Sequence, residues 1–453
     1  MLRHIFSVLI VIASVLPAPA QTVAIEYISF DAAKPVLQGF SDSLPPELKT
    51  SDAQKWPAWV KANDARIRQR LIRGEEDTLT NLLRFGVTFT KEYRIEDEYL
   101  VRYGQSSLVD SFANTRANDL IRALAAPHPA PGIAEMRDFL LSQGYSFKTP
   151  ADRAKVKQYL LANLARERND FLKYRAQKKD AARYQLFQDR GISLDSNLWP
   201  DYALDVAFRK LAEKGLLRPG SIRRIAIVGP GLDFVNKEAG LDFYPPQTVQ
   251  PFAVLDSLLR LGLADASSTE LFTFDISPSV NSHVRRIRQS AKDGNGYVVQ
   301  LPWNAKRPMS DEYRAAFTAY WQKLGAQIGS PVAAIPVPPS VAGTETRAVK
   351  IKAQVTARIT PIDTNIVYQR PALAADRKFD LVIGTNIFLY YGAFEQSLAR
   401  ANVAAMLKPG GLLLSNDKLP DTVPSGMQDA LNVDIVSSQN PLVTDTIFCY
   451  RRE

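Results

Sequence analysis

The pattern of apolar and polar positions changes near the middle of this 453-residue chain. From Ala32 to about Leu217, apolar residues recur mainly at three- and four-residue spacing, which is the period of an amphipathic helix. After the Arg-Pro-Gly triplet at 218–220, short apolar runs alternate with helix-period segments. That alternation predicts βαβ units and a mainly parallel sheet. We therefore expect a mostly helical domain over residues 21–217 and a Rossmann-like α/β domain over residues 218–453.

Individual elements follow from the same periods. In the first half, helices are predicted over residues 56–71, 75–85, 107–125, 133–141 and from Pro150 to about Phe187. In the second half, strands are predicted over residues 224–228, 270–274, 297–301, 379–385, 412–415, 433–437 and 444–450. An insertion is expected over about 303–378, with a helix near 310–326, a Pro-rich loop and one alternating strand from Val349 to Ile359.

The segment Phe379–Tyr391 joins a strand to a small polar triplet. Its apolar run is nearly continuous up to Gly384, Thr385 and Asn386, as a strand buried on both faces requires. Open α/β sheets bind ligands just beyond the carboxyl ends of such strands. An asparagine offers both a donor and an acceptor, so Asn386 is a candidate ligand contact, with local capping after the strand as the alternative.

A glycine pair follows the first predicted strand, at Gly229 and Gly231. Glycines there permit positive φ and a close approach of the backbone to a ligand, although ordinary tight turns use the same residues. The three-glycine fingerprint of dinucleotide-binding proteins fails, because Phe234 stands at its third glycine position.

Two further polar residues stand at or near strand ends. Asp275 ends the second predicted strand, where a carboxylate can accept hydrogen bonds from both ribose hydroxyls of a nucleoside. The alternative is that Asp275 caps the helix that starts at Ser277 and Pro278. Asn365 opens the run Asn-Ile-Val-Tyr upstream of Phe379 and is either a ligand contact or a turn residue.

Taken in order, these landmarks resemble those of class I, Rossmann-like S-adenosylmethionine-dependent methyltransferases. The family's order is matched by the glycine pair, Asp275, Asn386 and the Lys-Pro-Gly-Gly turn at 408–411, and residues 444–450 would form its antiparallel final strand. The runs 274–277, 365–367 and 379–391 are most similar to the chemotaxis-receptor (CheR-type) branch. The resemblance implies S-adenosylmethionine as cofactor, and the implied binding residues are Gly229, Gly231, Asp233, Asp275, Ile276, Asn365, Ile366 and Asn386.

Three positions depart from that family pattern. Ile227 stands where the family usually has an acidic residue, two places before the first glycine. Asp233 replaces the third glycine and is a candidate for the missing carboxylate. Thr385 replaces the arginine that the chemotaxis branch carries before its strand-end asparagine.

Few residues suggest a catalytic group or a metal site. Methyl transfer needs mainly positioning and removal of a proton, and Tyr390 and Tyr391 are candidate bases by position, with packing aromatics as the favoured alternative. Cys449 is the single cysteine, so an intramolecular disulfide is excluded, and with only three histidines we expect no Cys/His metal site.

The net charge of +9 permits an anionic partner. No run of Lys and Arg is unbroken, and acidic residues are interspersed, as in Arg-Glu-Arg at 166–168. The pattern therefore favours solvated helix faces over a nucleic-acid site.

The first 20 residues read as a secretory signal peptide. An apolar run at 5–16 follows Arg3, and Ala18-Pro19-Ala20 fits the small-x-small cleavage pattern. The run is shorter than the roughly 20 residues that span a bilayer, and no other transmembrane segment is expected. We expect export, with an uncleaved membrane anchor or a cytoplasmic protein as alternatives.

Export conflicts with a cytosolic methyl donor, so three functions remain open. The first is an active methyltransferase, whose acceptor the sequence does not identify. The second is an exported, non-catalytic protein of the same fold that acts as a binding module. The third is another nucleotide-dependent enzyme such as an oxidoreductase, against which the failed dinucleotide fingerprint counts.

Overall fold

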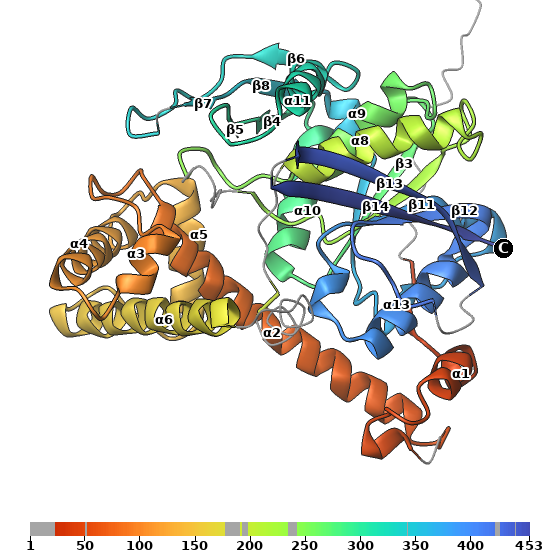
Figure 1. The fold of residues 1–453 in the computed structure, drawn as a ribbon, viewed down its shortest axis with the longest axis horizontal. Coiled ribbons are helices and arrows are strands. Elements are labelled where there is room, and N and C mark those ends of the chain that lie inside the picture. The colour runs from red at the N-terminus through yellow and green to blue at the C-terminus, as the bar shows by residue number, and fades with distance from the viewer. Residues whose placement is uncertain are drawn as a thin grey trace, which may run out of the picture.

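The computed structural model describes residues 23–49, 52–176, 191–192, 198–233, 242–341, 343–421, 426–439 and 441–453. The expected signal peptide and Phe234 lie outside these ranges. Within them, two regions are visible in Figure 1: a cluster of helices α3 to α6, and an α/β region around a central sheet. The long helix α2 runs from that cluster along the α/β region to α1.

The described part of residues 21–217 consists mainly of helices. They are α1 (Phe30–Gly39), the 3-10 turn η1 (Pro46–Leu48), α2 (Trp56–Phe85), α3 (Asp97–Arg102), α4 (Ser107–Leu124), α5 (Pro131–Ser142), α6 (Pro150–Ala176) and α8 (Leu198–Glu213). The sequence predicted two helices, at 56–71 and 75–85, where the structure has the single helix α2. Gly74 lies within this continuous helix, and its missing Cβ leaves room for the Ile192 carbonyl to pack against the helix. The expected extension of α6 to about Phe187 lies outside the described residues.

Seven strands form the central sheet in the order β13-β14-β12-β11-β2-β3-β9. They are β2 (Arg224–Val228), β3 (Glu270–Asp275), β9 (Ile359–Asp363), β11 (Phe379–Gly384), β12 (Leu407–Ser415), β13 (Met427–Gln439) and β14 (Leu442–Arg452). Only β14 pairs antiparallel, with β12 and β13; the other neighbouring pairs are parallel. This confirms a mainly parallel sheet with an antiparallel last strand.

The order of the parallel strands reverses between β2 and β11. The chain first builds outward from β2 through β3 to β9, then returns to the other side of β2 with β11 and β12. Ligands of open α/β sheets bind at such a switch point, outside the carboxyl ends of the strands. The glycine pair and Asn386 follow the two strands that flank it.

Helices cover both faces of the sheet. The strand β2 alternates, with Ile225 and Ile227 packing into one apolar cluster and Ala226 and Val228 into another. The first cluster is covered by α8 (Leu198–Glu213) and α9 (Gln250–Arg260), with part of α10 (Pro278–Lys292). The second contains α13 (Ala393–Met406), α1 and the amino-terminal half of α2. Residues of the first 217 therefore contribute to both layers, and the domain boundary near 217 stays a prediction.

The insertion differs from its prediction. The alternating residues 349–359 do not form one strand: β8 (Ala348–Ile351) is followed by the short helix α12 (Ala353–Thr356) and then by β9. β8 lies between β4 (Tyr297–Gln300) and β6 (Gly329–Val332) in a separate antiparallel sheet, so β4 is not a strand of the central sheet either. The alternation was misleading because Lys352 leaves the strand to begin a helical turn, after which the chain enters the central sheet.

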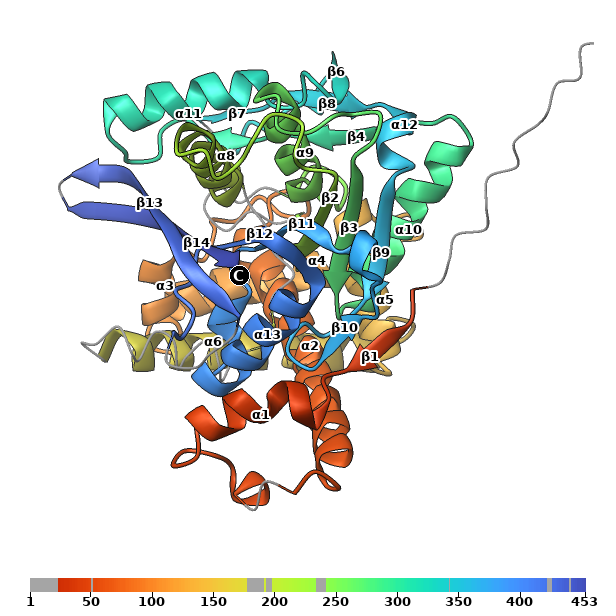
Figure 2. The same ribbon diagram turned by 90° about the vertical axis from the view of Figure 1, so that its right-hand side faces the viewer.

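The remaining elements are short. α11 (Asp311–Lys323) confirms the helix predicted in the insertion. β5 (Trp303–Asn304) pairs with β7 (Thr344–Glu345), and β1 (Ile25–Tyr27) pairs with β10 (Gln369–Pro371). Two 3-10 turns, η2 (Ala375–Arg377) and η3 (Phe388–Tyr390), flank β11. In Figure 2 the β13–β14 hairpin projects beyond the rest of the sheet.

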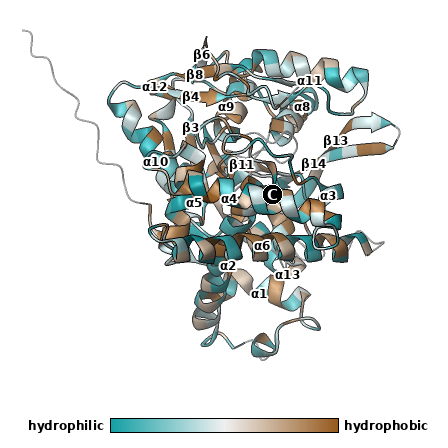
Figure 3. Cartoon of the chain, turned by 90° about the vertical axis from the view of Figure 1, so that its left-hand side faces the viewer, coloured by the Kyte–Doolittle hydropathy of each residue, from teal (hydrophilic) through white to brown (hydrophobic). Residues whose placement is uncertain are grey.

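Charged residues on the outer helices are mixed in sign. Arg166 of α6 forms ion pairs with Glu76 and Asp77 of α2, and Figure 3 shows hydrophilic and hydrophobic residues side by side along these helices. Among the described residues, no helix is both long enough and apolar enough to cross a bilayer.

Candidate functional site

The glycine loop after β2 joins the ends of two neighbouring strands. Gly229 and Gly231 have φ of +64° and +65°, a conformation that glycine adopts without steric cost. The Gly229 N–H donates to the Phe274 carbonyl of β3 at 2.8 Å. A Cβ built on Gly229 would lie 2.0 Å from Cδ1 of Ile387, beyond the end of β11. The positive φ expected of these glycines is present, whereas the close approach at Gly229 is to the Ile387 side chain, so the expected approach to a ligand stays a prediction.

Asp275 ends β3 and faces this loop. Its Oδ1 accepts a hydrogen bond from the Ser277 N–H at 2.8 Å, and the nearby backbone N–H groups of Gly231 and Ile276 favour the charged carboxylate and so act to lower its pKa. Burial raises the pKa of Asp275 to about 7, and the neighbouring carboxylate of Asp363 acts in the same direction. The structure thus brings Asp275 and Gly231 together, while Ser277 itself caps α10 by accepting from Val280.

Asp233 lies farther along the loop. Its carboxylate accepts hydrogen bonds from the Tyr244 hydroxyl at 3.0 Å and from the Gln247 side-chain amide at 3.2 Å. The two other predicted contacts, Ile276 and Ile366, are apolar and 7% and 3% exposed, and both belong to the cluster beneath α13. In this structure the Asp233 carboxylate is hydrogen-bonded to protein side chains, and Ile276 and Ile366 pack inside an apolar cluster.

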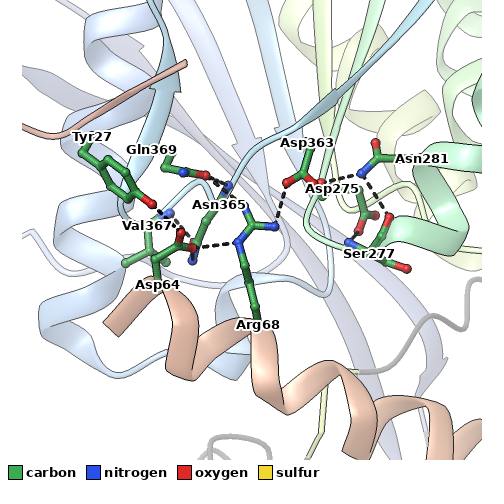
Figure 4. Close-up of polar contacts among 10 residues, drawn as sticks. All are labelled: Tyr27, Asp64, Arg68, Asp275, Ser277, Asn281, Asp363, Asn365, Val367 and Gln369. Atoms are coloured by element: carbon green, nitrogen blue, oxygen red, sulfur yellow. Dashed lines mark hydrogen bonds and ion pairs between the residues drawn. The ribbon is translucent and has the colours of Figure 1, made fainter. Parts of the chain in front are cut away.

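Asn365 is fully buried in the turn after β9. Its Nδ2 donates to Oδ1 of Asp64 at 2.8 Å, and its Oδ1 accepts from the Val367 N–H at 3.1 Å. Its own N–H donates to Oε1 of Gln369 at 3.0 Å. Figure 4 shows these contacts, in which Asn365 acts as a turn residue and as an anchor for α2 at once.

Two residues of α2 complete the group, and sequence reasoning did not find them. Asp64 accepts from the Tyr27 hydroxyl at 2.9 Å, besides its bond from Asn365. Arg68 donates to Asp64 at 3.1 Å, to Asp363 at 2.7 Å and to Gln369 at 3.0 Å. The sequence did contain one signal that could have found this pair. Asp64 and Arg68 stand at i and i+4 of a helix, on either side of the buried Ile67.

Asn386 follows β11 and is exposed. Its φ of +57° makes it the only non-glycine residue with positive φ in the described part of the chain. Asn416 holds it there: the Asn386 N–H donates to Oδ1 of Asn416 at 2.7 Å, and Nδ2 of Asn416 donates to Oδ1 of Asn386 at 2.8 Å. Such strained positions cluster at functional sites. Thr385 beside it accepts a hydrogen bond from Gln250 at 2.8 Å.

The candidate bases pack in the interior. Tyr390 and Tyr391 are 8% and 4% exposed within the cluster beneath α13. Burial raises the pKa of the Tyr391 hydroxyl above its ordinary value, so it stays protonated at neutral pH. No group of three or more His, Cys, Asp or Glu residues within the described ranges is arranged to hold a metal ion.

The polar groups therefore line one edge of the sheet. Gly229, Gly231 and Asp275 meet at the ends of β2 and β3, Asp363 lies opposite Asp275 in register, and Asn386 marks the end of β11. Backbone amides, two carboxylates and the exposed Asn386 at this edge are suited to a ligand rich in hydroxyl and amino groups. Their ligand-binding roles stay predictions.

No protein-family model and no curated protein matches the chain. Several solved structures have a distant likeness to this chain. One is the N-methyltransferase NodS from Bradyrhizobium japonicum WM9 with S-adenosyl-l-homocysteine, with 12% identity and a TM-score of 0.26, over 59% of this chain and 97% of that one. The magnesium protoporphyrin IX methyltransferase ChlM from Synechocystis PCC 6803 with bound SAM has 11% identity and a TM-score of 0.26, over 62% of this chain and 95% of that one. The glycopeptide N-methyltransferase MtfA with SAM has 12% identity and a TM-score of 0.20, over 54% and 75%. Likenesses this distant assign neither an activity nor a ligand to this chain.

Proposed function

We propose that this protein binds S-adenosylmethionine and is a methyltransferase or a methyltransferase-like protein. The observation that carries the proposal is that the glycine loop lies against the end of β3 at the switch point of the sheet, where the Gly229 N–H donates to the Phe274 carbonyl, one residue before Asp275. The strand order, with its antiparallel β14, and the strained Asn386 support it. The nearest branch we propose is the chemotaxis-receptor one, on the motifs at Asp275, Asn365 and Asn386.

The residues at this edge fit such a cofactor in chemical type. Because Gly229 and Gly231 carry no Cβ, no side chain of these two residues covers the backbone amides of the loop. When bound, S-adenosylmethionine supplies an activated methyl group on a sulfonium. Asp275 and Asp363 would accept hydrogen bonds from hydroxyl or amino groups of the nucleoside, and Asn386 would contact the ligand from the other side of the switch point. We assign no catalytic base.

Titration calorimetry with S-adenosylhomocysteine tests the proposal on the full chain. We expect saturable binding to the unaltered protein and binding weakened at least about tenfold in Asp275→Asn, because a buried charged acceptor would be lost, worth about 1.4 kcal/mol or more. Asp293→Asn, at an exposed position after α10, is the matched control and should bind normally. An absence of detectable heat at millimolar ligand would refute the proposal.

A second candidate is an exported binding module without turnover. It is favoured by the way that Asn365 and Asp275 are already bonded to protein groups and are 0% and 9% exposed. In that case S-adenosylhomocysteine would not bind. We also propose export directed by residues 1–20, which cell fractionation with amino-terminal sequencing of the recovered protein would test: a cytosolic protein beginning at Met1 would refute it.

A further inference from the structure

Arg68 lies across the end of the candidate site that β9 forms. Its guanidinium bonds to Asp363 at the end of β9 and to Gln369 in β10, while its Nε bonds to Asp64 one helical turn earlier. Figure 4 shows the side chain reaching from α2 toward the strand ends, between Asn365 and Asp363. Asp363 is paired in register with Asp275, the predicted ribose contact. Arg68 is therefore bonded to the carboxylate next to that contact.

The backbone of α2 is fixed in this position. Trp56, Val60 and Ile67 are 1%, 0% and 2% exposed and pack into the same apolar cluster as the sheet. The Trp56 indole N–H also donates to the Ile28 carbonyl at 2.8 Å. Lifting the helix would return these apolar side chains to water, which is unfavourable. Release of Asp363 by α2 therefore requires a movement of the Arg68 side chain and not of the helix.

The contacts of Arg68 are of a kind that can be released. The side chains of Arg68 and Asp363 are 29% and 47% exposed, and ion pairs that reach solvent contribute little to stability. When the guanidinium leaves, Asp64 keeps its bonds from Tyr27 and Asn365. Asp363 would then present its carboxylate, and it is better placed for an incoming ligand than Asp275, which is 9% exposed.

We propose that Arg68 is a gate at the nucleoside end of the site: it holds Asp363 in the free protein, and a ligand with hydroxyl or amino donors must displace it. The inference rests on the proposed function and adds a control of affinity to it. Arg68 and the ligand compete for one carboxylate, so removing the arginine strengthens binding. A residue that merely contacted the ligand would have the opposite effect.

The experiment is titration of full-length variants with S-adenosylhomocysteine. For Arg68→Ala we expect a Kd lower by about threefold to tenfold, which is about 0.6–1.4 kcal/mol. Arg66→Ala removes the same charge from an exposed position of the same helix and should leave Kd unchanged. In an Asp363→Asn background, Arg68→Ala should no longer strengthen binding, because the carboxylate for which Arg68 and the ligand compete is absent.

A ligand-free measurement checks that the variants fold and that the gate exists in solution. Carbodiimide labelling of carboxylates, read by mass spectrometry, should modify Asp363 several-fold more in Arg68→Ala than in Arg66→Ala. Equal or weaker ligand binding in Arg68→Ala than in the unaltered protein overturns the gate while leaving the proposed function standing. If no variant binds the ligand, the proposed function fails and the gate fails with it.

Discussion

Asn365 donates a hydrogen bond from Nδ2 to Oδ1 of Asp64, 2.8 Å away, although 301 positions of sequence separate the two residues. The bond joins α2 to the turn after β9, and Asp64 collects two more donors there, from Tyr27 and Arg68. A carboxylate that accepts from three side chains at a buried position fixes all of them, so Asp64 organises this corner of the candidate site.

The first prediction is that Asp64→Ala destabilises the protein by about 2–4 kcal/mol, because it leaves the buried amide of Asn365 without its acceptor and also removes the acceptor of the partly buried Tyr27 hydroxyl. Urea unfolding followed by circular dichroism measures the change. Asp64→Asn should recover part of the loss, since its amide oxygen can still accept. Lys61→Ala, exposed on the same helix, is the control, and a loss no larger than in that variant would contradict the prediction.

Much of the fold was predictable because its signals are local. The buried run that became β11 and the glycine pair after β2 each report a requirement that neighbouring residues satisfy. The antiparallel closing strand was predictable only through the family resemblance. The division of residues 349–359 between two sheets was not, because alternation fits either sheet until tertiary contacts decide.

The candidate site was predictable in its strand ends and not in its helix. Asp275 ends a predicted strand and Asn386 follows one, so the rule for open α/β sheets found them, whereas Asn365 was found only as an asparagine upstream of Phe379, because β9 was not predicted as a separate strand. Asp64 and Arg68 come from a helix some three hundred residues before their partners. Nothing local in the sequence of α2 specifies which strand end its polar residues reach, and that relationship arises only when α2 packs on the sheet.

The second prediction concerns pH and stability at Asp275. Burial raises its pKa from the ordinary 3.8 to about 7 in the folded protein, so the folded state binds the proton more tightly. Stability from this group is therefore present below about pH 4 and declines as the pH rises toward 7. The loss is at most roughly 4 kcal/mol, from 1.36 kcal/mol per pKa unit. Asp275→Asn should flatten this decline in urea unfolding measured from pH 4 to 8.

Asp265→Asn is the comparison for that experiment. Asp265 is exposed, and hydrogen bonds from Ser267 lower its pKa, so its substitution should leave the decline between pH 4 and 7 in place. A pH profile that is the same in Asp275→Asn as in the unaltered protein would show that Asp275 ionises freely in the folded state.

The third prediction separates backbone strain from steric conflict in the glycine loop. Gly229→Ala and Gly215→Ala both place a side chain at positive φ, +64° and +70°, which costs about 1 kcal/mol. Only at Gly229 does the new Cβ collide, 2.0 Å from Cδ1 of Ile387, whereas the space at Gly215 is open. Gly229→Ala should therefore lose about 1–3 kcal/mol more than Gly215→Ala in urea unfolding.

The double variant Gly229→Ala with Ile387→Ala tests the cause. Removing the Ile387 side chain makes room for the new Cβ, so the two substitutions should be less than additive. Additive losses of unfolding free energy would mean that the loop shifts away from Ile387 without cost. The close approach of Gly229 to Ile387 would then contribute nothing to stability.

The fourth prediction concerns Gly74, inside α2. In a solvated helix, exchanging glycine for alanine stabilises by about 1 kcal/mol. At Gly74 a Cβ would lie 1.8 Å from the carbonyl oxygen of Ile192, so Gly74→Ala should destabilise by about 1–3 kcal/mol instead. Ala62→Gly, at an exposed position of the same helix, measures the difference in helix propensity by itself and should cost about 1 kcal/mol.

If Gly74→Ala stabilises by as much as Ala62→Gly destabilises, the packing of residues 191–192 against α2 is absent in solution. If it destabilises, this packing explains why one continuous helix carries a glycine in its interior, and it fixes residues 191–192 against the helix that holds Asp64 and Arg68.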